Sequence, residues 1–358
     1  MSAKLRHIPS LDGLRAVSII LVVAGHAYHT LPVHSETVDV LNIFVGNADL
    51  GVITFFVISG YLITRLLRAE LEKQGGISLR HFYLRRMLRI FPAFYLYVAT
   101  ISVLAALGVI GTSTKSILAA ASFLLNYSQF WDPGAQSAQH FWFVGHFWTL
   151  ALEEQFYLLW PLALVVCGLD RSRRVAIAII FLSPLLRVLT YYFWPEGRTQ
   201  TALMLPTAAD SMMVGGALAL SEGREHFEAV VSRMSLPRVA LGALVVAFVV
   251  SPLLHHRYAG AYDLPLGRSV NALAMAVVIL HATRAPGMWL GRLLNSRVAV
   301  FVGTLSYSLY LWQQPFLTPL NTTWAGCFPI NLGVSLIAAL ASHYLVERPF
   351  LGMKDRRR

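Results

Sequence analysis

The sequence predicts an all-α protein, a polytopic membrane helical bundle with about ten transmembrane helices. Composition is the first observation, since 56% of the 358 residues are hydrophobic and only 13% are charged. The mean hydropathy of +0.59 is the second, and these values lie outside the range of soluble domains. The third is the length of the apolar runs, which suits membrane-crossing helices and exceeds the alternating segments of about ten residues in outer-membrane barrels.

Ten apolar segments are long enough to cross the hydrocarbon core of a bilayer as helices. In chain order, the expected spans lie near residues 14–32, 48–67, 88–110, 142–167, 174–194, 202–220, 238–254, 269–283, 298–317 and 328–346. Pro92 is expected to bend the third span. The shorter apolar stretch at 116–130 is expected to lie at the membrane interface or to re-enter the membrane without crossing it.

Basic residues alternate between successive loops, which predicts the orientation of the bundle. The loops and ends rich in basic residues contain Lys4, Arg6, Arg65, Arg68, Lys73, Arg80, Arg85, Arg86, Arg171, Arg173, Arg174, Arg224, Arg233, Arg284, Arg292, Arg297, Lys354, Arg356, Arg357 and Arg358. The intervening loops contain only Lys115, Arg198, Arg257 and Arg268. Because basic loops face the cytoplasm, both termini are predicted to be cytoplasmic, with residues 351–358 forming a basic cytoplasmic tail.

The sequence also argues against several classes of function. The net charge of +11 is distributed along the loops, whereas a nucleic-acid-binding protein gathers basic residues on one folded face, so no nucleic-acid partner is expected. No CxxC, HExxH, GxSxG or glycine-rich phosphate loop is present, and no metal site is expected. Cys167 and Cys327 fall on opposite sides of the predicted membrane, which argues against a disulfide between them.

Two ionisable residues lie within the first apolar segment, "LRAVSIILVVAGHAYH" at 14–29. An ionisable group held at such depth usually faces the interior of a bundle or a wet cavity. Arg15 and His26 are eleven residues apart, so on a helix they share a face to within about 20° and are separated by ~16 Å. This arrangement suits a long ligand with an anionic end near the cytoplasm and a reactive end deeper in the protein.

The chain resembles the acyltransferase-3 family of integral membrane O-acyltransferases, whose first helix carries an arginine, ten residues and then a histidine. The matching stretches are "LDGLRAVSIILVVAGH" at 11–26, "FFVISGYLIT" at 55–64, "RRMLRIFPAFY" at 85–95, "FWTLALEEQFYLLWP" at 147–161, "LSYSLYLWQQP" at 305–315 and "SHYLVERP" at 342–349. They extend over nearly the whole sequence, so residues 1–350 are expected to form the acyltransferase domain. One departure is Gln313, at a position where the family motif is expected to have histidine.

The resemblance implies transfer of an acyl group, usually acetyl, from cytoplasmic acyl-CoA to a hydroxyl group of a cell-surface carbohydrate or a lipid-linked glycan. It also implies an integral protein of the bacterial cytoplasmic membrane, in contact with membrane lipids. The chain is expected to be the stand-alone form of the family, without a fused hydrolase-like domain. The acceptor, the acyl chain length and a homo-oligomeric assembly are left open by the residues.

Five residues are the predicted site. His26 is expected to act as general base, since an imidazole in a poorly solvated groove favours its neutral form, with a covalent acyl-histidine intermediate as the open alternative. Arg15 is expected to bind CoA phosphate, although its position also suits a membrane anchor. The spacing of Arg86 and Arg89 matches the family and predicts phosphate binding, although arginines there also meet lipid phosphate. Glu154 is predicted to orient His26 or to bind the acceptor hydroxyl.

Glu154 is one of two adjacent carboxylates that could take this role. Glu153 and Glu154 lie well inside the predicted fourth span, and neighbouring residues on a helix cannot both face one groove. The sequence reasoning favours Glu154, with a structural lock between helices as the alternative interpretation.

Two other functions remain compatible with buried ionisable groups. A transporter or flippase for a glycan or lipid-linked intermediate would also contain them, although the apolar segments show no convincing inverted repeat. A non-catalytic scaffold in a polysaccharide assembly complex would give His26 no purpose. The acyltransferase interpretation therefore accounts for more of the sequence than either alternative.

Overall fold

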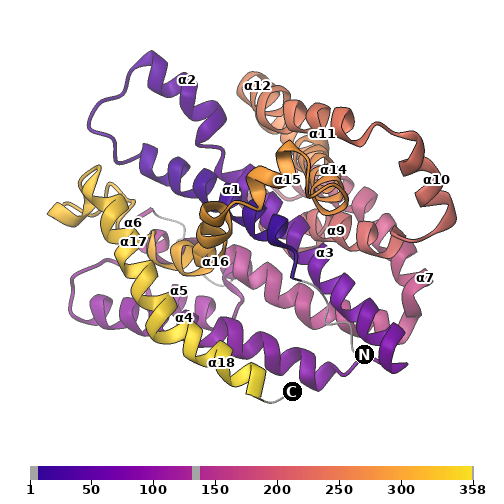
Figure 1. The fold of residues 1–358 in the computed structure, drawn as a ribbon. Coiled ribbons are helices and arrows are strands. Elements are labelled where there is room, and N and C mark those ends of the chain that lie inside the picture. The colour runs from indigo at the N-terminus through magenta and orange to yellow at the C-terminus, as the bar shows by residue number, and fades with distance from the viewer. Residues whose placement is uncertain (1–6, 131–137, 357–358) are drawn as a thin grey trace.

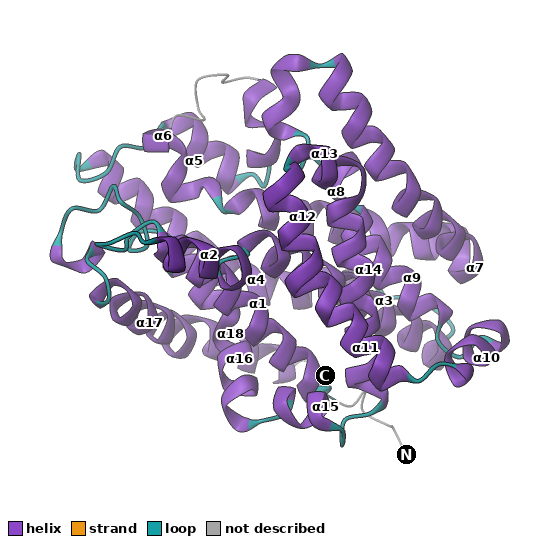
Figure 2. Ribbon diagram, turned by 90° about the horizontal axis from the view of Figure 1, so that it is seen from above, coloured by secondary structure: helices purple, strands orange, loops and turns teal. Residues whose placement is uncertain are grey.

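The computed structural model describes residues 7–130 and 138–356, and within them all regular secondary structure is helical. This confirms the predicted all-α class. Helices α2 and α12 lie at one end of the bundle and α18 at the other (Figure 1), and Figure 2 shows the same helices from above, joined by loops. The terminal basic residues Lys4, Arg6, Arg357 and Arg358 lie outside the described residues.

The α-helices of the first half are α1 (Pro9–Tyr28), α2 (Glu36–Val45), α3 (Ala48–Gln74), α4 (Leu79–Ala106), α5 (Thr114–Ala121), α6 (Ala138–Gly145), α7 (Phe147–Phe193), α8 (Leu205–Ala208) and α9 (Asp210–Ser221). Those of the second half are α10 (Glu225–Arg233), α11 (Leu236–Val245), α12 (Ser251–Tyr258), α13 (Gly260–Tyr262), α14 (Arg268–Arg284), α15 (Trp289–Leu294), α16 (Arg297–Trp312), α17 (Ile330–Ser342) and α18 (Arg348–Arg356). Short 3₁₀ or π turns are η1 (Leu125–Phe130), η2 (Pro195–Gln200), η3 (Val246–Val250), η4 (Asp263–Gly267), η5 (Trp324–Gly326) and η6 (His343–Glu347).

Seven helical stretches of the described chain are long and apolar enough to cross a membrane, consistent with the predicted polytopic bundle. The structure has three fewer long helical stretches than the ten segments expected from the sequence, and each difference has a structural cause. The expected fourth and fifth spans lie in one helical stretch, which is interrupted at Gly168 with φ of +72°. Two further expected spans form α9 and α16, which have 12 and 16 residues and fall short of the 18 residues required of a crossing helix.

Several helices extend past the expected spans at their charged ends. Helix α1 begins at Pro9, five residues before the expected boundary, because Ser10 and Asp12 are buried against other helices instead of lying in a loop. Helix α3 continues to Gln74, and α18 continues through Arg356 without a break at residue 350. Apolar content alone misses these helix ends, because protein neighbours or solvent satisfy their polar side chains.

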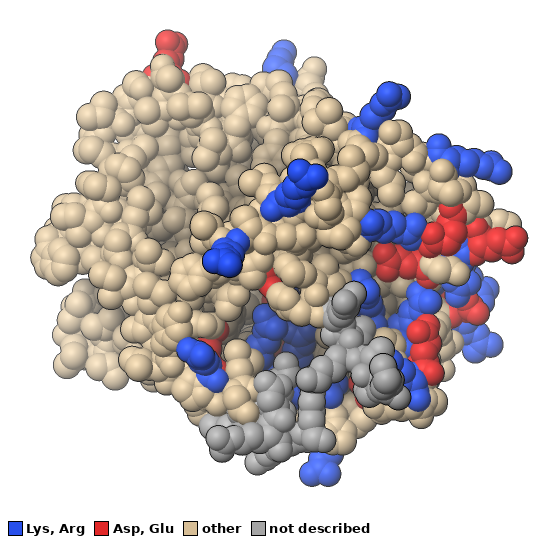
Figure 3. All heavy atoms as spheres, in the orientation of Figure 1, with Lys and Arg blue, Asp and Glu red and all other residues tan. Residues whose placement is uncertain are grey.

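Charged side chains are unevenly distributed over the surface. Figure 3 shows them gathered around α10 and the C-terminal part of α3, whereas the opposite side of that face is almost free of them. Many large apolar side chains are exposed, including Phe181, Phe193 and Leu345 at 74%, 83% and 75%. Such exposure is expected of a helical bundle that faces lipid.

Close contact between α3 and α9 fixes the position of one wall of the site. A Cβ atom on Gly60 would lie 1.9 Å from the carbonyl oxygen of Met212, and one on Gly215 would lie 2.1 Å from that of Val57. Larger residues at either position would separate the two helices, as is typical of small-residue contacts in membranes. Ser59, next to Gly60, is thereby held at a defined depth.

A buried ion pair joins α7, α9 and α14. The Arg187 guanidinium is fully buried, with one Nη atom 3.0 Å from Asp210 and 2.9 Å from the Ser269 hydroxyl. Its remaining nitrogens donate to the backbone carbonyls of Leu264 and Thr207. Because every nitrogen of this arginine donates a hydrogen bond, its charge is compensated within the fold, and the group is structural.

Candidate active site

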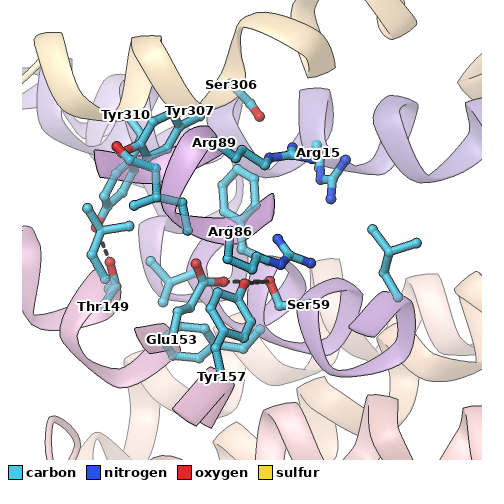
Figure 4. Close-up of a pocket in the computed structure, with 16 residues that line it drawn as sticks. Arg15, Ser59, Arg86, Arg89, Thr149, Glu153, Tyr157, Ser306, Tyr307 and Tyr310 are labelled. Atoms are coloured by element: carbon cyan, nitrogen blue, oxygen red, sulfur yellow. Dashed lines mark hydrogen bonds between the residues drawn. The ribbon is translucent and has the colours of Figure 1, made fainter. Parts of the chain in front are cut away.

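Five helices, α1, α3, α4, α7 and α16, converge on a cavity with about 760 Å³ of empty space. It is lined by Arg15, Val52, Phe55, Phe56, Ser59, Leu62, Arg86, Arg89, Ile90, Thr149, Leu150, Glu153, Tyr157, Ser306, Tyr307 and Tyr310. Figure 4 shows Arg15 on one side of this cavity and Thr149 with Tyr310 on the other. Segments from the whole length of the sequence therefore build one site.

The structure brings the three predicted phosphate-binding arginines together in this cavity. Arg15 donates to Asp12 over 2.9 Å, and the other oxygen of that carboxylate lies 2.5 Å from His7. The Arg86 guanidinium lies 4.7 Å from the ring centroid of Tyr157, a cation–π contact. Neither Arg86 nor Arg89 forms a salt bridge with a residue in the described part of the chain. Arg85, by contrast, pairs with Glu70 at 3.3 Å.

The carboxylate that lines the cavity is Glu153. Its Oε1 atom accepts a hydrogen bond of 2.5 Å from the Ser59 hydroxyl, which in turn accepts one of 3.1 Å from Tyr157. Glu154 is absent from the lining, and its buried Oε1 has no hydrogen-bond partner among the described residues. The geometry therefore points to Glu153 as the carboxylate nearer a cavity ligand, whereas the catalytic role assigned to Glu154 stays a prediction.

His26 lies beyond the cavity, near the end of α1, where its ring is held by a chain of hydrogen bonds. Its Nδ1 is 2.8 Å from Oε1 of Gln313, whose Nε2 donates to Oε1 of Gln314 over 3.0 Å. Nε2 of Gln314 donates to the backbone carbonyl of Trp142 over 3.0 Å. Because a backbone carbonyl can only accept, the two glutamine amides are oriented and Gln313 offers an acceptor to His26.

The orientation of Gln313 determines which His26 nitrogen carries the proton. Since Oε1 of Gln313 accepts, Nδ1 of the neutral ring is the donor and Nε2 retains its lone pair. The edge of the Trp142 ring packs against this imidazole, with the ring centroids 5.6 Å apart. The glutamine that departs from the family motif therefore provides the acceptor that fixes the basic tautomer.

Helix α16 connects the cavity to His26. Tyr310 lines the cavity and bonds to the Thr149 hydroxyl at 2.7 Å, and Gln313 follows it by three residues, about one helical turn. The cavity lining thus ends at Tyr310, about one helical turn before the residue that contacts His26.

Sequence reasoning missed a second histidine beside this end of the cavity. His146 is 5% exposed, and its ring centroid lies 5.4 Å from that of Tyr310. Both ring nitrogens are buried without a hydrogen-bond partner among the described residues. Its place directly before the "FWTLALEEQFYLLWP" stretch was the available signal.

Other side chains of the site have structural partners. Tyr307 donates to the backbone carbonyl of Ile90 over 2.8 Å, and Trp312 packs edge-on against Tyr97. Both cysteines are free. Within residues 7–130 and 138–356, no group of three or more histidine, cysteine or acidic side chains is placed to hold a metal ion.

Comparison with known proteins identifies the relatives of this chain. The family profile described as an acyltransferase domain matches residues 8–347. A peptidoglycan O-acetyltransferase of Listeria monocytogenes is 26% identical over 96% of this chain and 55% of its own length. A Staphylococcus aureus protein provisionally named an O-acetyltransferase is 29% identical over 97% of this chain and 58% of its own length.

The chain spans a little more than half the length of the curated relatives it matches. No solved structure matches it.

Proposed function

Because this chain belongs to the acyltransferase-3 family, we propose that it transfers an acetyl or related acyl group from acyl-CoA to a hydroxyl group of a cell-envelope carbohydrate. Peptidoglycan is one candidate acceptor, since a relative is named for it. The proposal includes location in the bacterial cytoplasmic membrane with both termini in the cytoplasm.

One observation carries the proposal: three arginines and a single glutamate line a cavity whose lining ends about one helical turn before the glutamine that orients His26. This excess of positive charge suits an anionic ligand, and guanidinium groups bind phosphate through paired N–H donors. The phosphates of CoA would lie at Arg15, Arg86 and Arg89. The acyl end of the donor would then extend past Tyr310 toward His26.

The oriented imidazole provides the base for acyl transfer. Nε2 of His26 takes the proton of the acceptor hydroxyl as its oxygen attacks the thioester carbonyl. The carbon–sulfur bond breaks as the tetrahedral intermediate collapses, and the CoA sulfur leaves with the proton that the imidazolium returns. The products are the O-acyl ester, free CoA thiol and neutral His26, so no further reactant is needed.

Release of free thiol tests this reaction against transport. Purified protein in lipid nanodiscs, given acetyl-CoA and a saccharide acceptor, is expected to release CoA thiol at a rate that depends on the acceptor. Thiol is measured with a chromogenic disulfide reagent, and acylated saccharide by mass spectrometry. A transporter or flippase would move its cargo without thiol release, and that result would contradict the proposal.

Paired substitutions of the two adjacent carboxylates separate their roles. Glu153→Gln retains an oxygen that accepts from Ser59 but removes the charge beside the arginines, and it is expected to lower turnover at least about tenfold. Glu154→Gln is the paired variant and is expected to lower turnover less than Glu153→Gln, because the Glu154 side chain does not line the cavity. Thiol release measures both variants, and the reverse order of effects would return the role to Glu154.

A further inference from the structure

A second cavity lies at the other end of α3 from the basic residues of that helix. It has about 1380 Å³ of empty space, and its walls come from α2, α3, η2, α12, α13, η4 and α14. Asp49 in the first turn of α3 lines it, whereas Arg65 and Arg68 lie four to five helical turns further along. In the proposed orientation this cavity opens on the side away from the cytoplasm.

Two neighbouring side chains on α14 present unsatisfied polar atoms in the wall of this cavity. Arg268 and Asn271 are each 7% exposed and are one helical turn apart. Nη1 of Arg268 donates to Asp49 over 2.6 Å. Nε and Nη2 of Arg268 and Oδ1 of Asn271 are buried without a hydrogen-bond partner among the described residues. Two donor nitrogens and one acceptor oxygen of these lining residues thus lack a partner among the described residues, and a ligand reaches them when the two side chains turn toward the cavity.

The charges around this cavity are balanced. Its lining contains two arginines, Arg198 and Arg268, and two aspartates, Asp49 and Asp263. Asp49 is paired with Arg268, and Asp263 contacts His255. The first cavity, by comparison, has three arginines and one glutamate. A balanced, polar wall favours a neutral ligand, whereas an anionic ligand such as CoA favours the first cavity.

The wall of the second cavity adjoins the helix turn that carries His26. A Cβ atom on Gly25, the preceding residue, would lie 2.6 Å from the carbonyl oxygen of Gly46 and 3.1 Å from Cβ of Ala48. Gly46 and Ala48 both line the cavity. A ligand there is therefore separated from the α1 backbone beside His26 by a single segment of chain.

We propose that this cavity binds a neutral saccharide segment of the acyl acceptor, an inference that rests on the function proposed above. The free N–H groups of Arg268 donate to a sugar hydroxyl or amide oxygen. Oδ1 of Asn271 accepts from a sugar O–H or amide N–H. Such a ligand provides both kinds of group side by side, whereas a carboxylate or phosphate would leave Asn271 unmatched.

Binding without an acyl donor tests the site. Full-length protein in nanodiscs is titrated by calorimetry with a tetramer of β-1,4-linked N-acetylglucosamine and, separately, with the corresponding glucose tetramer. Asn271→Leu keeps a similar volume but removes the acceptor oxygen, and it is expected to weaken binding about tenfold. Arg268→Lys keeps the charge beside Asp49 and is expected to weaken binding similarly. Leu273→Ala, at a half-exposed position on the same helix, is the control and is expected to bind as wild type.

The outcomes separate this site from the proposed reaction. Tighter binding of the N-acetylated tetramer assigns the paired atoms to an amide, and equal binding of both tetramers assigns them to hydroxyl groups. The absence of binding to wild type, or unchanged affinity in both site variants, would overturn the site. Unchanged acceptor KM in folded Asn271→Leu, with thiol release intact, would leave acyl transfer standing and remove the site. Loss of saccharide binding in Asn271→Leu, together with no thiol release from wild type, would support the saccharide site and contradict acyl transfer.

Discussion

Substitution of His26 by alanine is expected to lower acyl transfer at least about 100-fold while the protein remains folded in the membrane. The physical reason is the loss of Nε2, the nitrogen whose lone pair the Gln313 contact leaves free. The side chain is only partly buried, so its removal leaves a small space beside Trp142 and little lost packing. Acceptor-dependent thiol release and mass spectrometry of the saccharide measure the effect.

The matched control is His29→Ala, since His29 lies three residues further along and is exposed. It is expected to retain wild-type turnover. Size-exclusion profiles and thermal unfolding of both variants show whether they are folded. Residual turnover above a tenth of wild type in a folded His26→Ala protein would remove His26 from the role of base.

The sequence predicts well the features that depend on one helix or on composition. The apolar composition indicates a membrane protein, and the length of the apolar runs indicates helices, because lipid leaves helices and closed barrels as the only spanning structures and barrel segments are shorter. Arg86 and Arg89 line the same cavity as Arg15, and their role in phosphate binding stays a prediction. The family resemblance predicted a role for each arginine, whereas their position in one cavity depends on how α4 packs near α1 and is a finding of the structure.

Features that depend on contacts between helices were beyond the sequence. The side chains of Glu153 and Glu154 point about 100° apart around α7. Which of them faces the cavity therefore depends on the rotation of that helix against its neighbours. The contact of His26 with Gln313 joins residues 287 positions apart, and the pattern predicted only a departure from a motif there. His146 belongs to no periodic pattern in the sequence. A single histidine between two helices cannot be distinguished by sequence from any other buried histidine.

Helix ends were misplaced for a related physical reason. A prediction from hydropathy ends a span where polar side chains begin. Asp12, however, lies within α1 at 8% exposure, with Arg15 and His7 as its partners. A polar group satisfied by protein costs far less than one in lipid. The first helix therefore begins at Pro9, where a proline-containing first turn is favourable.

The side of the membrane from which each substrate approaches is expected to have an all-or-none effect on acyl transfer. CoA carries several negative charges and does not cross a bilayer unaided, so the donor must reach Arg15, Arg86 and Arg89 from the side on which they lie. In the proposed orientation this is the cytoplasmic side, and His26 lies ~16 Å further along α1. The acceptor is then expected to approach from the opposite side.

Sealed vesicles with the protein in one orientation provide the measurement. With saccharide trapped in the lumen, externally added acetyl-CoA is expected to acylate it only when the cytoplasmic face is outward. Orientation is determined beforehand by protease cleavage of a tag at the C-terminus, and detergent-opened vesicles provide the control in which both orientations react. Efficient acylation in the opposite orientation, with both substrates outside, would mean that both reactants reach the imidazole from one side. That result would contradict transfer through the membrane even if His26 proved essential.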